Sequence, residues 1–309
     1  MTLLETTPAM PAVDAPAPAP QPQRPRFPVR GTIATALLIL STSLLGFTLY
    51  IGLVSDLHYD RAQHNAYADF RVQLAKATAP TGPTDPNNPN ALLAPGSAVA
   101  VLDIPEIGLN TVVFEGTTSG IMENGPGHLR STQLPGQVGT SEIMGRAATY
   151  GAPFGRISQL NPGDVFTVTT GQGVARYRVA DIRRAGDREP APLAAGHGRL
   201  ILATADGFAF MPSGVLRVDA NLTSPANPAP PMVLSLANLS PAEQALAGDS
   251  SAWLPLVLWG QGLLLAAGLI TWARSRWGKW QVWIVAVPVL GFLGLSVADQ
   301  VARLFLNLM

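Results

Sequence analysis

The sequence predicts a mostly β domain held in a membrane by three transmembrane helices. Three observations lead to this fold class. Three apolar segments are each long enough to cross a bilayer, and short runs of β-forming residues alternate with turn signals between residues 96 and 223. Only 13% of the 309 residues are charged, whereas a soluble domain usually has about 25%. The formal net charge is zero, so nothing indicates a nucleic-acid partner.

The N-terminal part predicts a disordered tail followed by a membrane anchor. Residues 1–30 are rich in Pro, Ala and Gln, which favours extended, unpaired backbone. Residues 31–54 are uncharged and span a hydrocarbon core of about 30 Å. Arginines precede this segment, which places the tail in the cytoplasm. A cleaved signal peptide would have a shorter apolar core and a nearby cleavage site, so an anchor is favoured.

The middle of the chain predicts a helix, a linker and one compact domain. Residues 55–95 begin with apolar residues at three- and four-residue steps, typical of a helix, and end in the Pro-rich linker "TAPTGPTDPNNPN". Residues 96–223 hold about eight short β-type runs, which favours a barrel or a sandwich.

The C-terminal part predicts two further spans. Residues 224–252 form a linker in which Ser240, Pro241 and Glu243 predict a short helix. The spans are expected at 253–273 and 280–300, and the basic loop 274–279 between them is expected in the cytoplasm. The β domain and the end of the chain, 301–309, then lie outside the plasma membrane.

Five sequence motifs lie in order along the β domain. They are "LDIPEIGLNTVVFEGTT", "GPGHLRSTQLPGQVGT", "MGRAATYGAPFGRISQLNPGDVFTV", "LILATA" and "GVLRVDANL". With these motifs in this order, the domain resembles a membrane-anchored, actinobacterial-type sortase, a member of the transpeptidases that attach proteins to Gram-positive cell walls. The resemblance implies an eight-stranded β-barrel.

The same resemblance implies that the catalytic positions are degenerate. Arg146 stands at the histidine position, Ala205 at the cysteine position and Val215 at the arginine position. Arg217 is two residues further along the same strand and is expected to face the same groove. The remaining groove positions implied by the resemblance are Thr140 and Thr204.

These replacements predict a protein without sortase activity. Alanine has no nucleophilic atom, and arginine stays protonated and cannot act as a general base. Two alternatives stay open. One is a peptide-binding module that uses the old groove. The other is a transpeptidase or hydrolase with a replaced nucleophile, for which the candidates are Thr204, Ser213 and Ser141, with His128 or His197 as base.

No metal, cofactor or disulfide is expected. The chain has no cysteine, and its four histidines show no metal-binding spacing. Four carboxylates, at Asp103, Glu106, Asp206 and Asp219, do not follow the spacing of a calcium loop. The expected partners are the lipid bilayer and other membrane subunits, in an accessory or scaffold role, with a peptide as the alternative ligand.

A polar stripe ends the last span. Asp299, Gln300, Arg303 and Asn307 follow helical steps of three and four residues. If the span ends near residue 298, these side chains lie among lipid headgroups. If it continues, they need protein partners, because charge inside a bilayer is costly. The sequence therefore predicts a docking surface for a partner helix or for the first span.

Overall fold

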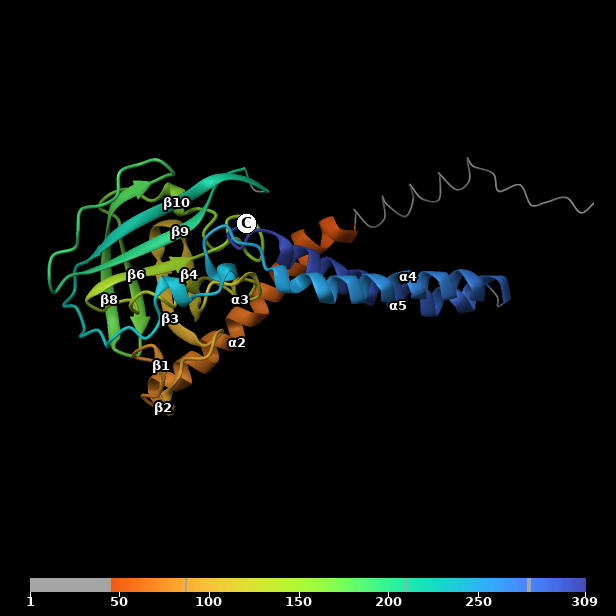
Figure 1. Cartoon of the computed structure of the whole chain (residues 1–309), viewed down its shortest axis with the longest axis horizontal. Helices are drawn as coiled ribbons and strands as arrows, with labels where there is room; N and C mark the ends of the chain where they lie inside the picture. The colour runs from red at the N-terminus through yellow and green to blue at the C-terminus, as the bar shows by residue number, and fades with distance from the viewer. Residues whose placement is uncertain (1–45, 87, 209, 277–278) are drawn as a thin grey trace, which may run out of the picture. The chain divides into compact units, whose positions relative to one another are not determined.

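The computed structural model describes residues 46–86, 88–208, 210–276 and 279–309 (Figure 1). The predicted tail, 1–30, and most of the first predicted span, 31–54, lie outside the described residues. The residues described below belong to one compact unit.

A closed barrel forms the centre of this unit, with strand order β10-β8-β7-β3-β4-β5-β6-β9. This confirms the predicted eight-stranded barrel. The strands are β3 (Ala98–Ile104), β4 (Leu109–Glu115), β5 (Gly127–His128), β6 (Gly139–Met144), β7 (Val165–Thr170), β8 (Gly173–Arg183), β9 (Gly198–Phe208) and β10 (Met211–Leu222). Pairing is antiparallel except at β4–β5 and β6–β9, which are parallel.

Alternation along each strand separates the inside of the barrel from its outside. On β10, Leu216, Val218 and Ala220 point into the main apolar core, while Val215 and Arg217 lie on the outer face. The outer face of β6, β9 and β10 is where the resemblance places the groove, so the strand period decides which side chains reach it.

One long helix packs against the barrel. Residues 46–49 are helical and continue through the π-helical turn η1 (Tyr50–Val54) into α2 (Ser55–Ala75). Phe70 is fully buried in a cluster with Val101, Val112 and Phe114 of the barrel. The described part of the first predicted span is thus joined rigidly to the domain.

The region expected as a linker before the barrel contains a small sheet. Strands β1 (Thr84–Asp85) and β2 (Asn88–Leu92) pair with each other. A sheet with only two residue pairs is too short to give a periodic pattern in the sequence, and the prolines of this region favour a linker instead. After the barrel, Ser240 caps the short 3-10 turn Pro241–Glu243, and its side chain accepts a hydrogen bond from the backbone N–H of Ala242.

The chain then forms a helical hairpin of α4 (Trp253–Arg276) and α5 (Lys279–Leu304). Both contain stretches long and apolar enough to cross a membrane, at Ser250–Ile270 and Ile284–Leu304. Large apolar side chains on both helices are exposed, as a lipid-facing surface requires, and an edge-on contact between Trp259 and Phe292 joins the two. Two of the three predicted spans thus have candidates among the described residues. The last candidate stretch continues past the predicted end at residue 300 to Leu304.

Candidate functional site

The outer faces of β6, β9 and β10 bring the expected groove residues together. Val215 pairs with Ala205, and Ala203 pairs with both Arg217 and Met144. Arg146 follows two residues after the end of β6. The predicted positions of nucleophile, base and arginine therefore meet at one place, as the resemblance implies.

Thr204 faces the opposite way. Its side chain is buried, and its hydroxyl donates to the carbonyl oxygen of Gly145 at 2.8 Å. This bond joins the end of β6 to β9 beneath the groove, so the hydroxyl of Thr204 has a structural partner. The resemblance implies a groove position for Thr204, whereas the strand period turns its side chain away from the face that holds Ala205.

Arg146 is almost completely buried, with 1% exposure, and its guanidinium is bonded on every side. Its Nε donates to the carbonyl oxygen of Met122, and one terminal nitrogen donates to the carbonyl and hydroxyl oxygens of Ser119 at 3.0 and 2.8 Å. The other terminal nitrogen donates to the hydroxyl of Thr149 and to the backbone oxygen of Met309. Burial lowers the pKa of Arg146, but a guanidinium pKa starts so high that the charge persists.

The last residues of the sequence lie over the groove. Leu308 is fully buried in an apolar cluster that includes Ala203 and Val215 and against which Ala205 packs. The backbone oxygen of Leu308 accepts a bond from Ala147 N–H, and that of Met309 accepts one from Thr149 at 2.6 Å. The chain therefore covers its own groove where the sortase nucleophile is expected. Apart from Asn307, residues 305–309 are apolar, so their composition resembles the end of a membrane span.

The other end of the groove is open and polar. Thr140 and Arg217 line a pocket of about 470 Å³ together with the arginines 183 and 199 and the segment 189–193 before β9. Glu142 stands in the same pocket, where burial raises its pKa and the neighbouring arginines oppose that rise. Arg217 thus lies in the groove, as expected, but away from the buried end.

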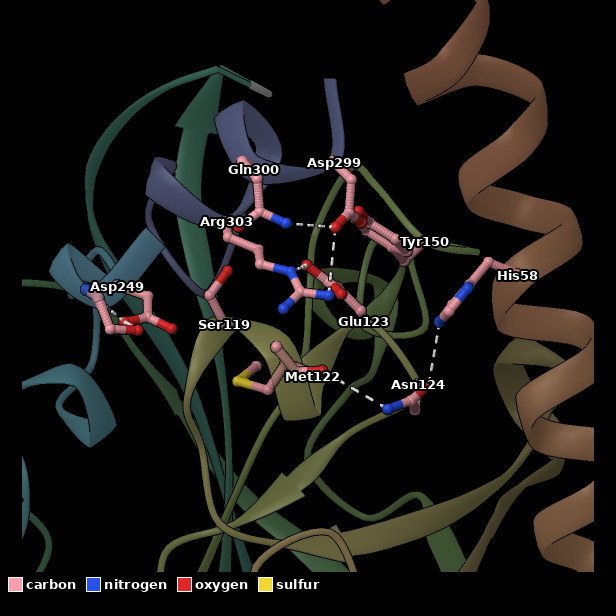
Figure 2. A network of polar contacts seen from close by, with 12 residues as sticks. His58, Ser119, Met122, Glu123, Asn124, Tyr150, Asp249, Asp299, Gln300 and Arg303 are labelled. Carbon is pink, nitrogen blue, oxygen red and sulfur yellow. Dashed lines mark hydrogen bonds and ion pairs between the residues drawn. The ribbon is translucent and has the colours of Figure 1, made fainter. Parts of the chain in front are cut away.

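The polar stripe of α5 contacts the chain's own residues (Figure 2). Asp299 accepts hydrogen bonds from Tyr50 at 2.8 Å and from Gln300 at 2.9 Å, and pairs with Arg303 at 3.2 Å. Asn307 is fully buried and donates to the carbonyl oxygens of Thr117 and Gln244.

The first predicted span supplies Tyr50 as a partner of Asp299, and the first span was one of the two partners considered for the docking surface. Thr117, which follows β4 of the barrel, supplies a partner of Asn307. Among the described residues, Arg303 Nε and Asn307 Oδ1 keep no hydrogen-bond partner.

Glu123 lies at the centre of this network and was not expected from the sequence. Its carboxylate is 3.4 Å from the Nε of Arg303, an ion pair without hydrogen-bond geometry, so both atoms lack a hydrogen-bond partner. Burial raises the pKa of Glu123 to about 7. Arg303 and Arg146 oppose the rise, and Asp299 adds to it. The signal was hidden because Glu123 reads as an ordinary polar residue at the end of the short helix α3 (Ser119–Met122).

The candidates for a replaced nucleophile do not pair with a base. Ser213 bonds the carbonyl oxygen of Asp206, Ser141 has no hydrogen-bond partner, and His197 contacts only a nearby backbone oxygen. His128 is buried, and its two ring nitrogens face the Glu115 carboxylate at 2.8 Å and the carbonyl oxygen of Gln133 at 2.9 Å.

Both of these partners are acceptors, so both ring nitrogens of His128 must donate. Burial lowers the pKa of His128, Glu115 raises it, and the net direction is upward. A histidinium is favoured at this position, and a histidinium cannot take a proton from the nearby Thr132 hydroxyl.

The carboxylates considered for calcium are dispersed or paired with cations. Asp219 bonds Arg183, and Asp206 lies 3.4 Å from Arg184. Within the described parts of the chain, no three potential metal ligands gather at one place.

Comparison with known proteins places the barrel among sortases. A sortase-domain family model matches residues 102–209. Sortase E from Streptomyces avermitilis is 30% identical, with coverage of 43% of this chain and 91% of that one and a TM-score of 0.38. Sortase D5 from Clostridium perfringens is 21% identical, with 54% and 98% coverage and a TM-score of 0.42. Sortase E1 from Streptomyces coelicolor, solved with a tripeptide in its active site, is 24% identical, with 43% and 92% coverage and a TM-score of 0.36. No curated protein matches the chain.

Replacing Leu308 tests how strongly residues 305–309 bind in the groove. Leu308→Ala removes a fully buried side chain and is expected to cost about 2 to 5 kcal/mol in the free energy of unfolding. Leu306→Ala is the matched control, because Leu306 is only half-buried and its loss should cost less. Thermal unfolding of the full chain in mild detergent measures both. Equal decreases in unfolding free energy for the two variants would contradict a specific binding site for the Leu308 side chain.

Glu123 makes the stability of the domain depend on pH. Because the folded-state pKa lies near 7, above the unfolded value of 4.5, folding favours the protonated form. The stabilising contribution is complete below pH 4.5 and is lost as the pH rises through about 7. Glu123→Gln keeps the neutral form at every pH. The variant should therefore gain stability relative to the wild type between pH 5 and 8. A constant difference in melting temperature across that range would refute this assignment.

Proposed function

Because the chain belongs to the sortase family, we propose that it is a catalytically inactive member that serves as an accessory or scaffold subunit of a membrane or cell-envelope complex. One observation carries the proposal. The groove holds Ala205 and the buried guanidinium of Arg146 where a thiol and an imidazole are expected, and Leu308 of the same chain lies over them.

The chemistry of acyl transfer supports loss of activity. A sortase reaction requires a thiolate to attack a peptide carbonyl and a group that transfers the proton to the leaving amine. Alanine supplies no nucleophile. The guanidinium of Arg146 already donates to five acceptors and has no lone pair to accept a proton.

The covered groove favours a scaffold over a peptide receptor. A substrate carbonyl would have to reach Ala205, and the apolar cluster around Leu308 fills that space. Displacing Leu308 would also remove Met309 from the guanidinium of Arg146 and leave a buried charge with fewer acceptors, which is costly. The open pocket beside Arg217 is the observation that keeps a peptide receptor as the second candidate.

The same contacts support a topology in the plasma membrane. Residues 307–309 bond the barrel directly after α5 ends, so the barrel and the end of α5 lie on one side of the bilayer. If α4 and α5 both cross, the connection at 277–278 lies on the other side. Basic residues at 274–279 favour the cytoplasm for that connection and so support a barrel on the outer side of the membrane.

A peptide-cleavage assay tests the lack of activity. The full chain in detergent should not cleave or transfer a fluorogenic LPxTG-type peptide, whereas an active sortase does so in parallel. Turnover above the blank that is removed by Arg146→Ala or Ala205→Val would overturn the proposal. Binding without turnover that is lost in Arg217→Ala would favour the peptide receptor.

Protease accessibility tests the topology. Protease added to intact cells should digest the barrel and spare an epitope tag placed at residue 1, because residues 1–30 are expected in the cytoplasm. A tag inserted at 277–278 should be spared as well. Digestion of either tag in sealed cells would reverse the assignment, and permeabilised cells provide the control for tag accessibility.

A further inference from the structure

The hairpin formed by β9 and β10 ends in an exposed apolar tip. Phe208 is 85% exposed, Met211 79% and Phe210 50%, although Phe208 and Met211 are paired across the hairpin. Their backbones are therefore ordered while their side chains have little protein to contact. Scattered apolar residues on a surface are ordinary, but three at one hairpin tip form a patch that requires an explanation.

Ring contacts fix where this tip lies. Phe210 is 6.5 Å from the ring of Phe305, and Phe305 is 6.1 Å from the ring of Phe47. Phe305 directly follows Leu304, the last residue of a candidate membrane span, and Phe47 belongs to the first predicted span. Figure 1 shows the hairpin reaching out of the barrel on the side of the helices. The apolar tip is thus continuous with the surface expected to face lipid.

We propose that the β9–β10 hairpin tip inserts into the lipid interface beside the membrane spans. Phe208 and Met211 would enter the region between headgroups and acyl chains, where apolar side chains are buried by about 5 to 10 Å. The inference rests on the membrane anchoring proposed above and is independent of the loss of catalysis.

The charged residues near the tip determine whether its insertion should depend on the headgroup charge of the lipid. Asp206 and Arg184 form an ion pair at 3.4 Å at the base of the hairpin, and the exposed turn beyond it carries Asp187 and Arg188. The two signs balance, so electrostatic attraction to anionic headgroups is not expected to dominate. Insertion should therefore proceed in neutral phosphatidylcholine and change little when anionic lipid is added.

Single-cysteine labelling tests this proposal in the full chain, which has no native cysteine. Met211→Cys carries an environment-sensitive fluorophore in nanodiscs of phosphatidylcholine that hold one copy each. Val174→Cys is the water-exposed control. Val174 is 60% exposed, and it lies beyond the point where Tyr177 pairs with Leu222, at the end of β10 opposite Met211. Leu265→Cys, on the exposed face of α4, is the lipid control.

The label at residue 211 should show blue-shifted emission and quenching by lipids with a shallow nitroxide, as an interfacial position requires. Adding Phe208→Asp should return its emission toward that of residue 174 while the melting temperature in detergent stays unchanged, because Phe208 packs against little protein. If residue 211 reports water while residue 265 reports lipid, the hairpin does not insert. If residue 265 also reports water, the membrane anchoring itself fails. A blue shift that appears only in discs with two copies would assign the tip to self-association and overturn the proposal.

Discussion

A single buried charge organises the region where the barrel meets the helices. The guanidinium of Arg146 has five N–H donors, and an unpaired donor in a buried site costs about 1 to 3 kcal/mol or more. Its acceptors come from α3, from the loop that holds Thr149, and from Met309 beyond α5. These segments must therefore remain in place together. The face of Tyr150 lies 4.8 Å from the same group and adds a cation–π contact.

Further polar contacts extend from this charge toward the membrane helices. Tyr50 bonds Asp299, and Arg303 spans the distance between Asp299 and Glu123. A helix that leaves a bilayer normally shields its polar groups with water or lipid headgroups. Here Tyr50 of the helix that leads into α2, Glu123 after α3, and Asp299 and Arg303 of α5 contact one another directly, so directional bonds join the end of α5 to the barrel unit.

Strand alternation and turn residues are local signals, so the sequence predicted about eight short strands in a barrel or a sandwich, and the resemblance to sortases implied the barrel. The resemblance supplied Arg146, Ala205 and Val215, and the strand period placed Arg217 on the same face as Val215. The sequence did not predict that Leu308 is buried in the groove. An apolar residue after a membrane span shows the same hydrophobic pattern whether it faces lipid or packs against protein. Glu123 was missed since its environment depends on Arg303, which is far away in the sequence. The two-residue strands β1 and β5 were too short to register as periodic.

The replacement of the catalytic positions and the covering of the groove are physically connected. An imidazole has two ring nitrogens and could not satisfy Ser119, Met122, Thr149 and Met309 together, whereas a planar guanidinium does so from one position. A thiol in place of Ala205 would add volume and a polar atom against the apolar cluster that receives Leu308. The same two substitutions that are expected to remove the nucleophile and the base therefore create the binding site for the end of the chain. Opening the groove would require Leu308 and Met309 to leave, and the guanidinium of Arg146 would then lose one of its five acceptors. These shared contacts hold the sortase-like barrel and the segment after α5 in one arrangement.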